Sequence, residues 1–378
     1  MIYFDNSATT AVLPEAADAA RRYMTERYFN PAAAYAPAVQ LERDIKAART
    51  LIAGELGASP DELVFTSCGT ESNNTALFGA LRAQRGKGRV IVSAVEHPSV
   101  YEAAIDLREQ GYDVVFAPVD KTGAVDTEAL KELVTPNTQL VSVMHVNNES
   151  GAVNDVSGAY SLVKRLAPEC VVHSDGVQAF MKEGPVKCDL YSVSGHKLHD
   201  PKGVGALYIR NGVRVKPYLI GGGQESGMRS GTTNAPAIMA FSAAVSDWAA
   251  HRREYREGIF AVKKRLYTNL SRMRDVVLNG PELEKAAPHI LNMSFLGVRG
   301  EVLLNALSEK GLCVSTGSAC AAHKRGRNRI LNAMGVLGER QDGAIRFSFS
   351  HFNTVDEADR AAQLIEEQVN LLRRFKRR

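Results

Sequence analysis

The feature that most constrains the fold is an alternation of short β-rich runs and helical stretches between about residues 38 and 250. Residues 39–56 have apolar side chains at helical spacing and predict an amphipathic helix. Later runs have the length and composition of strands: residues 90–92, 114–117, 140–146, 171–173, 190–193 and 204–209. Strands separated by helices predict an α/β fold with a mostly parallel sheet covered by helices on both faces. In such a sheet, ligands bind at the carboxyl ends of the strands.

The sequence from about residue 253 has a different pattern. A helical stretch at residues 255–274 precedes short apolar runs at 290–295, 313–315 and 345–350, and a helix is expected at 355–375. A chain of 378 residues also exceeds the size of most single cores. We therefore predict a large domain at residues 15–252 and a smaller α+β domain made of residues 1–14 and 253–378.

Composition narrows the classes of partner. The 46 basic and 42 acidic residues give a net charge of +4, too small to indicate direct nucleic-acid binding. No apolar run approaches the roughly 18 residues of a membrane span, and the first residues lack the pattern of a secretion signal. We expect a cytoplasmic protein with no membrane partner.

The five cysteines are odd in number and include no Cys-x-x-Cys pair. This spacing argues against a disulfide framework or a zinc site, so we expect no metal. One reactive thiol among inert ones is the remaining expectation.

Two strand ends carry residues suited to an electrophilic cofactor. Lys197 follows the run 190–193 in a Ser-Gly-His-Lys turn, and a lysine there can form a Schiff base if its pKa is depressed. Asp175 follows the run 171–173 and could pair with a cationic ring nitrogen. Taken singly, Lys197 could be a surface lysine and Asp175 a helix N-cap.

A third strand end has the composition of an anion site. Small and hydroxyl residues at 66–74 lie between the apolar run 63–65 and a helix expected at 71–85. Backbone amides and the helix dipole favour phosphate at such a position. The alternative is a simple capping box built on Thr70. A phosphate loop, a carboxylate and a lysine in this order indicate a pyridoxal-phosphate (PLP) site more strongly than any one of them.

Several motifs resemble those of cysteine desulfurases, which are class-V aminotransferases of PLP fold type I. They are Asp175-Gly-Val-Gln178, Ser194-Gly-His-Lys197, Met228-Arg-Ser-Gly-Thr232 and Ser315-Thr-Gly-Ser-Ala-Cys320. Further similar segments, Tyr3-Phe-Asp-Asn-Ser-Ala-Thr-Thr10, His145-Val-Asn-Asn-Glu149 and Ile345-Arg-Phe-Ser348, extend the resemblance over nearly the whole chain. The motif that ends in Cys320 resembles that of the desulfurase branch whose cysteine lies on a long loop.

The resemblance implies a role for each matching residue. Lys197 would form the Schiff base with PLP and later move the substrate's α-proton. Asp175 would hold the ring nitrogen, Gln178 the phenolic oxygen, and His97 would stack on the ring and assist proton transfer. The phosphate would be held by Gly69, Thr70, Ser194 and His196, joined by Thr232 of a partner subunit in a homodimer. Asn148, beside the cofactor, and Arg346 would bind the carboxylate of L-cysteine.

Two of these roles have structural alternatives. His97 precedes Pro98 and could instead cap the following helix, and Arg346 could form a structural ion pair.

Cys320 is the residue that distinguishes a desulfurase within this family. The resemblance implies that its thiolate attacks the substrate sulfur, which leaves a persulfide on Cys320 and releases L-alanine. Basic residues that follow it would lower its pKa. Cys313 is the better candidate for an inert thiol. The basic segment 323–329 suggests docking of an acidic sulfur acceptor, such as an iron–sulfur scaffold or a tRNA-thiolation enzyme.

Three positions depart from the family pattern. Asp200 stands where glycine is usual, and we expect it to tolerate an unusual backbone angle and to add negative charge near Lys197. Cys68 replaces a common glycine and Tyr35 a frequent histidine. Two other readings stay open: another class-V PLP enzyme, such as a selenocysteine lyase or aminotransferase, and a catalytically silent binding homologue.

Overall fold

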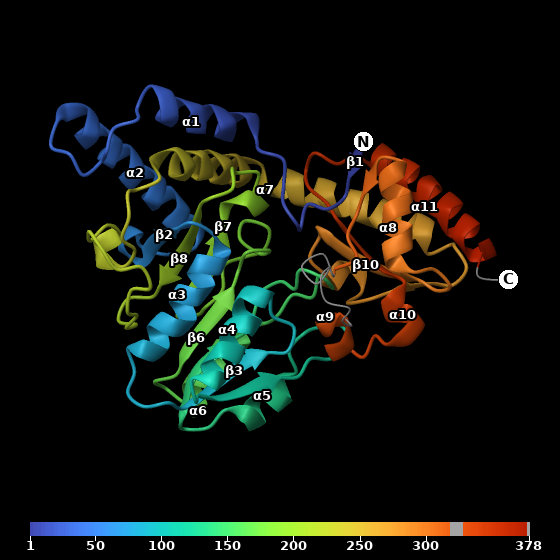
Figure 1. Ribbon diagram of the computed structural model, residues 1–378, viewed down its shortest axis with the longest axis horizontal. Coiled ribbons are helices and arrows are strands. Elements are labelled where there is room, and N and C mark those ends of the chain that lie inside the picture. The colour runs from blue at the N-terminus through green and yellow to red at the C-terminus, as the bar shows by residue number, and fades with distance from the viewer. Residues whose placement is uncertain (318–327, 376–378) are drawn as a thin grey trace.

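A seven-stranded sheet forms the centre of the larger part of the molecule (Figure 1). The computed structural model describes residues 1–317 and 328–375. The strands lie in the order β2 (Leu63–Thr66), β8 (Gly205–Ile209), β7 (Leu190–Ser194), β6 (Val171–Asp175), β5 (Thr138–Ser142), β3 (Arg89–Ser93) and β4 (Asp113–Ala117). β8 is antiparallel to both its neighbours, and the other pairs are parallel. The predicted mostly parallel α/β sheet is confirmed.

Both faces of the sheet are covered by helices. Successive side chains of a strand point to opposite faces, so each strand buries apolar residues on both sides. Val90 and Val92 pack in one cluster with residues of α3 (Gly69–Arg82) and α4 (Pro98–Glu109). Ile91 packs in another with residues of α5 (Thr127–Leu133) and α6 (Val156–Leu166). Near-continuous apolar strands such as β3 follow from this double covering.

The C-terminal part contains a smaller antiparallel sheet with the order β12 (Ala344–Ser348), β10 (Ile290–Phe295) and β9 (Val276–Leu278). Its helices are α8 (Gly300–Glu309), α9 (Arg329–Ala333), α10 (Gly338–Asp342) and α11 (Val355–Phe375). The first strand of the chain, β1 (Ile2–Tyr3), pairs in parallel with β11 (Leu312–Cys313). The N-terminus therefore lies in the C-terminal part of the molecule (Figure 1).

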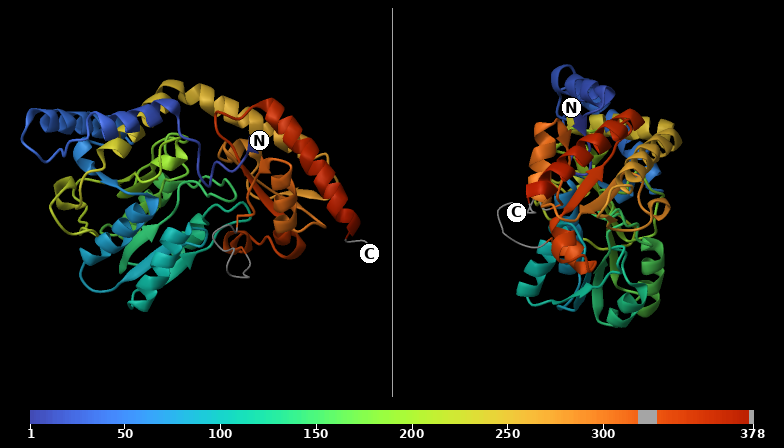
Figure 2. Two further views of the ribbon diagram at one scale, coloured as in Figure 1. Left: turned by 45° about the horizontal axis from the view of Figure 1, so that its top comes forward. Right: turned by 90° about the vertical axis from the view of Figure 1, so that its right-hand side faces the viewer.

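One long helix, α7 (Ala235–Leu270), runs between the two parts (Figure 2). It packs against α1 (Pro14–Thr25) and α2 (Ala36–Glu55) near one end and against α11 near the other. Asn234 caps it by accepting a hydrogen bond from Ala237 N at 3.3 Å. This start lies well before the helix expected at 255–274, because the cap and proline signal in Asn234-Ala-Pro was missed. The predicted domain boundary at residues 252 and 253 falls inside α7, and the division stays a prediction.

Other boundaries differ by a few residues. β5 ends at Ser142 rather than at residue 146, although His145 N still donates to Asp175 O at 2.9 Å. Across the described ranges, none of the helices combines the length and apolarity that a membrane crossing requires.

Candidate active site

A cavity of about 800 Å³ opens where β6 and β7 end. Ten of the predicted site residues line it: Gly69, Thr70, His97, Asn148, Asp175, Gln178, Ser194, His196, Lys197 and Arg346. The structure thus brings together residues that are up to 277 positions apart in the chain, Gly69 to Arg346. Thr232 is exposed and is not among the residues that line the cavity. Cys320 lies outside the described residues.

Lys197 lies at the end of a short 3-10 turn, η2 (Gly195–Lys197), directly after β7. Its Nζ donates to Ala8 O at 2.7 Å and also to Ser7 O. Gln178 Nε2 donates to the same Ser7 carbonyl at 3.0 Å. The segment after β1 therefore places the amine of Lys197 beside the amide of Gln178.

Asp175 is the last residue of β6 and is buried. One carboxylate oxygen accepts from Asn73 Nδ2 and the other from Val177 N, at 2.8 and 2.9 Å. The second contact closes a turn, since no helix begins there, so the N-cap alternative does not hold. Asn73 belongs to α3, one turn after its start, and fixes the carboxylate at the cavity wall.

The N-terminus of α3 lies at this cavity, because its first residues, Gly69 and Thr70, line it. Its N-cap, Cys68, makes no side-chain cap bond, and the helix begins at Gly69 rather than at residue 71, so Thr70 forms no capping box. A Cβ on Gly69 would lie 2.7 Å from Val177 Cγ2, which explains why glycine is needed there. Ser194 Oγ is buried and has no hydrogen-bond partner among the described residues. This arrangement suits an anion.

His97 is both a helix cap and part of the cavity wall, and its role toward the cofactor ring stays a prediction. It caps α4, because its Nδ1 accepts from Ser99 N at 3.2 Å, and its ring also lines the cavity. Burial lowers the pKa of His97, an effect that nearby Asp175 opposes. Burial, and then the charge of Lys197, lower the pKa of His196 to about 3. Both imidazoles are therefore neutral near pH 7.

Arg346 forms the structural ion pairs considered as the alternative to substrate binding. Its Nη1 donates to Glu149 Oε1 at 2.9 Å and its Nη2 to Asp5 Oδ1 at 2.8 Å. Its Nε has no hydrogen-bond partner among the described residues, nor does Asn148 Oδ1. The guanidinium is thus both held by carboxylates and placed at the cavity.

Four residues of the site were not predicted to have a role: Asn73, Ser7, Glu149 and Asp5. Asp5 and Ser7 lie in the Tyr3–Thr10 motif, and Glu149 ends the His145–Glu149 motif. Asn73 lies one helical turn after Gly69, on the same face of the helix, and helical side chains tilt toward the N-terminus. That spacing could have predicted that Asn73 reaches the site.

Comparison with known proteins agrees with this geometry. The family model described as aminotransferase class-V matches residues 2–361. The chain belongs to the class-V aminotransferase family. A cysteine desulfurase of Nostoc sp. is 38% identical over 99% of this chain and 94% of its own length. The resemblance inferred from the motifs is confirmed.

Two solved structures are similar to this chain over nearly their whole length. A NifS-like protein superposes with a TM-score of 0.92 at 36% identity, covering 98% of this chain and 99% of its own. SspA in complex with cysteine gives a TM-score of 0.81 at 29% identity, covering 94% of this chain and all of its own. The predicted PLP fold type I agrees with these neighbours.

Class-V aminotransferases and cysteine desulfurases depend on PLP, and the residues of this cavity fit that cofactor. The unpartnered Ser194 Oγ and the uncapped start of α3 suit a phosphate. The Asp175 carboxylate suits a protonated ring nitrogen, and Lys197 an aldehyde. No group of three or more metal-ligating side chains was found within residues 1–317 and 328–375.

Asp200 differs from the expectation in two ways. The residue with a left-handed backbone is its neighbour His199, with φ of 66°, so Asp200 itself needs no unusual angle. Its carboxyl is buried, without hydrogen-bond partners among the described residues, and burial raises its pKa to about 9. Asp200 is therefore neutral near pH 7, and the expected negative charge near Lys197 is absent.

The other two departures lie at helix starts. Cys68 lines the cavity as the N-cap residue of α3, and Tyr35 is the N-cap residue of α2.

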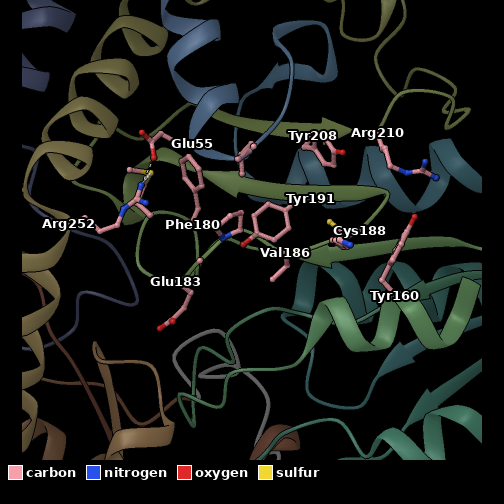
Figure 3. A pocket seen from close by; sticks show the side chains of 16 residues that line it. Glu55, Tyr160, Phe180, Glu183, Val186, Cys188, Tyr191, Tyr208, Arg210 and Arg252 are labelled. Atoms are coloured by element: carbon pink, nitrogen blue, oxygen red, sulfur yellow. Dashed lines mark hydrogen bonds and ion pairs between the residues drawn. The ribbon is translucent and has the colours of Figure 1, made fainter.

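A second cavity, of about 280 Å³, is lined in part by residues from segment 180–188 of the loop between β6 and β7 (Figure 3). Aromatic rings of Tyr160, Phe180, Tyr191 and Tyr208 line it. Four of its charged side chains form ion pairs: Arg252 with Glu55, Arg210 with Asp189 and Glu183 with Arg256. It contains none of the predicted site residues.

Proposed function

We propose that this protein is a PLP-dependent cysteine desulfurase that converts L-cysteine to L-alanine and carries the released sulfur as a persulfide on Cys320. The observation that carries the proposal is that Lys197, Asp175 and Arg346 line one cavity in a chain of this family. Bound PLP would supply an aldehyde that condenses with amines and a ring that withdraws electrons.

The residues of the chain would divide the work. Asp175, fixed by Asn73, would keep the ring nitrogen protonated, and the start of α3 with Ser194 and His196 would hold the phosphate. Lys197 Nζ would remove and return the substrate's α-proton. Neutral His97 would assist that proton transfer, and Arg346 with Asn148 would orient the substrate carboxylate.

The sulfur step would fall to Cys320. Its thiolate would attack the sulfur of the bound cysteine, so that an S–S bond forms as the substrate's C–S bond breaks. The electron pair of that bond would take a proton and complete L-alanine. The thiol would thereby become a persulfide, and no outside oxidant is needed.

The test replaces Cys320 with alanine. We expect Cys320→Ala to bind the cofactor normally but to stop the formation of alanine from L-cysteine. Mass spectrometry of the wild type, after L-cysteine, should find one extra sulfur atom on Cys320, with Cys313→Ala as the matched control. An aminotransferase has no need of Cys320, so a Cys320→Ala variant of undiminished activity would refute the proposal.

We further propose a cytoplasmic homodimer in which Thr232 of one subunit reaches the phosphate of the other. Thr232 is exposed and does not line the cavity of its own chain, as a residue that serves the partner's site requires. A Thr232→Ala variant should bind PLP more weakly.

The sulfur acceptor would be an acidic protein of an iron–sulfur or tRNA-thiolation system. The docking segment must be narrower than residues 323–329, however. Arg329 stacks on Tyr101 and donates to the carbonyls of Ala94 and Glu96, so its charge is used within the chain. Reversing the charges of Lys324, Arg325 and Arg327, which lie outside the described residues, should weaken sulfur transfer while sparing alanine release.

A further inference from the structure

The guanidinium of Arg346 is already held by two carboxylates of its own chain. Asp5 and Glu149 accept from its two terminal nitrogens at 2.8 and 2.9 Å. The side chain of Arg346 is only 6% exposed, so water does little to screen these charges. A third carboxylate, that of the substrate, would have to share one buried cation with both.

Glu149 divides its two carboxylate oxygens between different neighbours. Oε1 accepts from Arg346 and from Asn148 Nδ2. Oε2 is buried and has no hydrogen-bond partner among the described residues. An unpaired buried acceptor of this kind is costly and calls for an explanation.

An unused donor lies near the free oxygen. A Cβ built on Gly317 would lie 1.9 Å from Glu149 Oε2 and 2.9 Å from Asn328 Nδ2, so both atoms border the same small space. Asn328 Nδ2 also has no hydrogen-bond partner within the described part of the chain. Asn328 Oδ1, by contrast, is committed to capping α9 through Ile330 N and Leu331 N.

These contacts give Glu149 two alternative partners. Burial raises the pKa of Glu149, and the charge of Arg346 opposes that rise. The carboxylate can leave Arg346 only if another donor receives it, and Asn328 Nδ2 is beside it. For Asp5, the hydrogen bond seen within the described residues is the one to Arg346.

We infer that Glu149 is a positioning residue that competes with the substrate carboxylate for Arg346 and transfers its hydrogen bond to Asn328 Nδ2 when the substrate binds. The inference rests on the proposed function, because it requires that Arg346 receive the substrate carboxylate. The inference adds a determinant of specificity: a substrate carboxylate binds Arg346 only by displacing the carboxylate of Glu149.

The test measures binding to the holoenzyme of two amines that differ only in a carboxylate, L-alanine and ethylamine, through the absorbance of the cofactor. In Glu149→Gln the charge that competes for Arg346 is lost, while the shape is kept. We expect L-alanine to bind about fivefold to tenfold more tightly, since a charge-assisted bond exceeds a neutral one by about 1 kcal/mol. Ethylamine should bind as it does to the wild type.

Glu183→Gln is the matched control variant. Glu183 is also a largely buried carboxylate in an ion pair, with Arg256 at 3.0 Å, but it lines the second cavity (Figure 3). It should leave the binding of both amines unchanged. Weaker or unchanged L-alanine binding in Glu149→Gln would overturn the inference, because a residue that only orients Arg346 cannot improve binding when it is lost.

Asn328→Asp tests the other partner and carries the test if Glu149→Gln does not fold. Aspartate can still cap α9, but it replaces the donor near Glu149 with a like charge. We expect L-alanine to bind several-fold more weakly and ethylamine to be unaffected; equal effects on both amines would contradict the exchange. A wild type that binds ethylamine no more weakly than L-alanine would instead count against the role of Arg346 in the proposed function.

Discussion

The two cavities of this protein contain similar residue types but use them differently. In the second cavity, Arg252 pairs with Glu55 and Arg210 with Asp189, among aromatic rings (Figure 3). Two side chains of that cavity, Glu183 and Arg252, keep a buried polar atom without a partner among the described residues. In the Lys197 cavity seven side chains do so: Ser7, Asn73, Asn148, Glu149, Ser194, Asn328 and Arg346. A buried polar group without a partner is costly to keep, so seven of them around one cavity indicate a ligand that completes them.

The difference shows that unpartnered polar groups in a cavity wall are what distinguishes a binding site from other cavities. The second cavity has satisfied most of its own charges, and we assign it no chemistry. The first cavity has more hydrogen-bond donors and acceptors without partners, and it lies at the carboxyl ends of the strands, where α/β folds bind ligands. The following variants test this contrast from the largest expected effect to the smallest.

Lys197→Ala should have the largest effect. The loss of the amine that would move the α-proton is expected to lower kcat for L-cysteine by about a thousandfold or more, since general acid–base groups contribute about 10²–10⁴. Alanine release measures it. Lys187→Ala, on the wall of the second cavity, should behave as the wild type; a comparable loss there would remove the contrast between the cavities.

Asp175→Asn should weaken the binding of PLP and leave the stability of the fold unchanged. A charge-assisted hydrogen bond contributes about 1.5–3 kcal/mol, so we expect the Kd for PLP to rise about tenfold to a hundredfold. Titration of the apoprotein by absorbance gives this value. An unchanged Kd would mean that the Asp175 carboxylate serves only the turn to Val177 and the bond to Asn73.

Asp200→Asn should change how stability depends on pH. The pKa of Asp200 is raised to about 9 in the folded chain, against about 4 when unfolded. Its protonated form therefore stabilises the fold fully below about pH 4, and this contribution is lost as the pH rises toward 9.

We expect the urea midpoint of Asp200→Asn to rise relative to the wild type between pH 5 and pH 9. The relative gain in the free energy of unfolding should reach about 1–3 kcal/mol at the alkaline end. A difference that stays constant across this range would show that Asp200 does not titrate in it.

Arg252→Met should have the smallest effect. The ion pair with Glu55 is partly exposed, and such pairs contribute about 0–1 kcal/mol. Urea unfolding should detect no more than this, and the KM for L-cysteine should not change. A shift in KM would couple the second cavity to the first.

The sequence by itself determined the sheet, the family and most of the residues that line the Lys197 cavity. Apolar runs at strand spacing are a local signal, and the helix α11 and strand β10 were predicted to the residue for that reason. The motifs around Lys197, Asp175 and Arg346 can also be recognised from adjacent residues alone. The start of α7 was missed although its cap signal was present in Asn234-Ala-Pro.

Only the tertiary structure decided which groups face each other. Nothing in the local sequence says that Asn73 holds Asp175, that Ser7 receives Lys197 and Gln178, or that Glu149 lies between Arg346 and Asn328. Nor could it show that Asp200 is neutral, because a pKa depends on burial rather than on residue type. Charge, desolvation and hydrogen bonding are set by distances across the fold, and those distances join residues far apart in the chain.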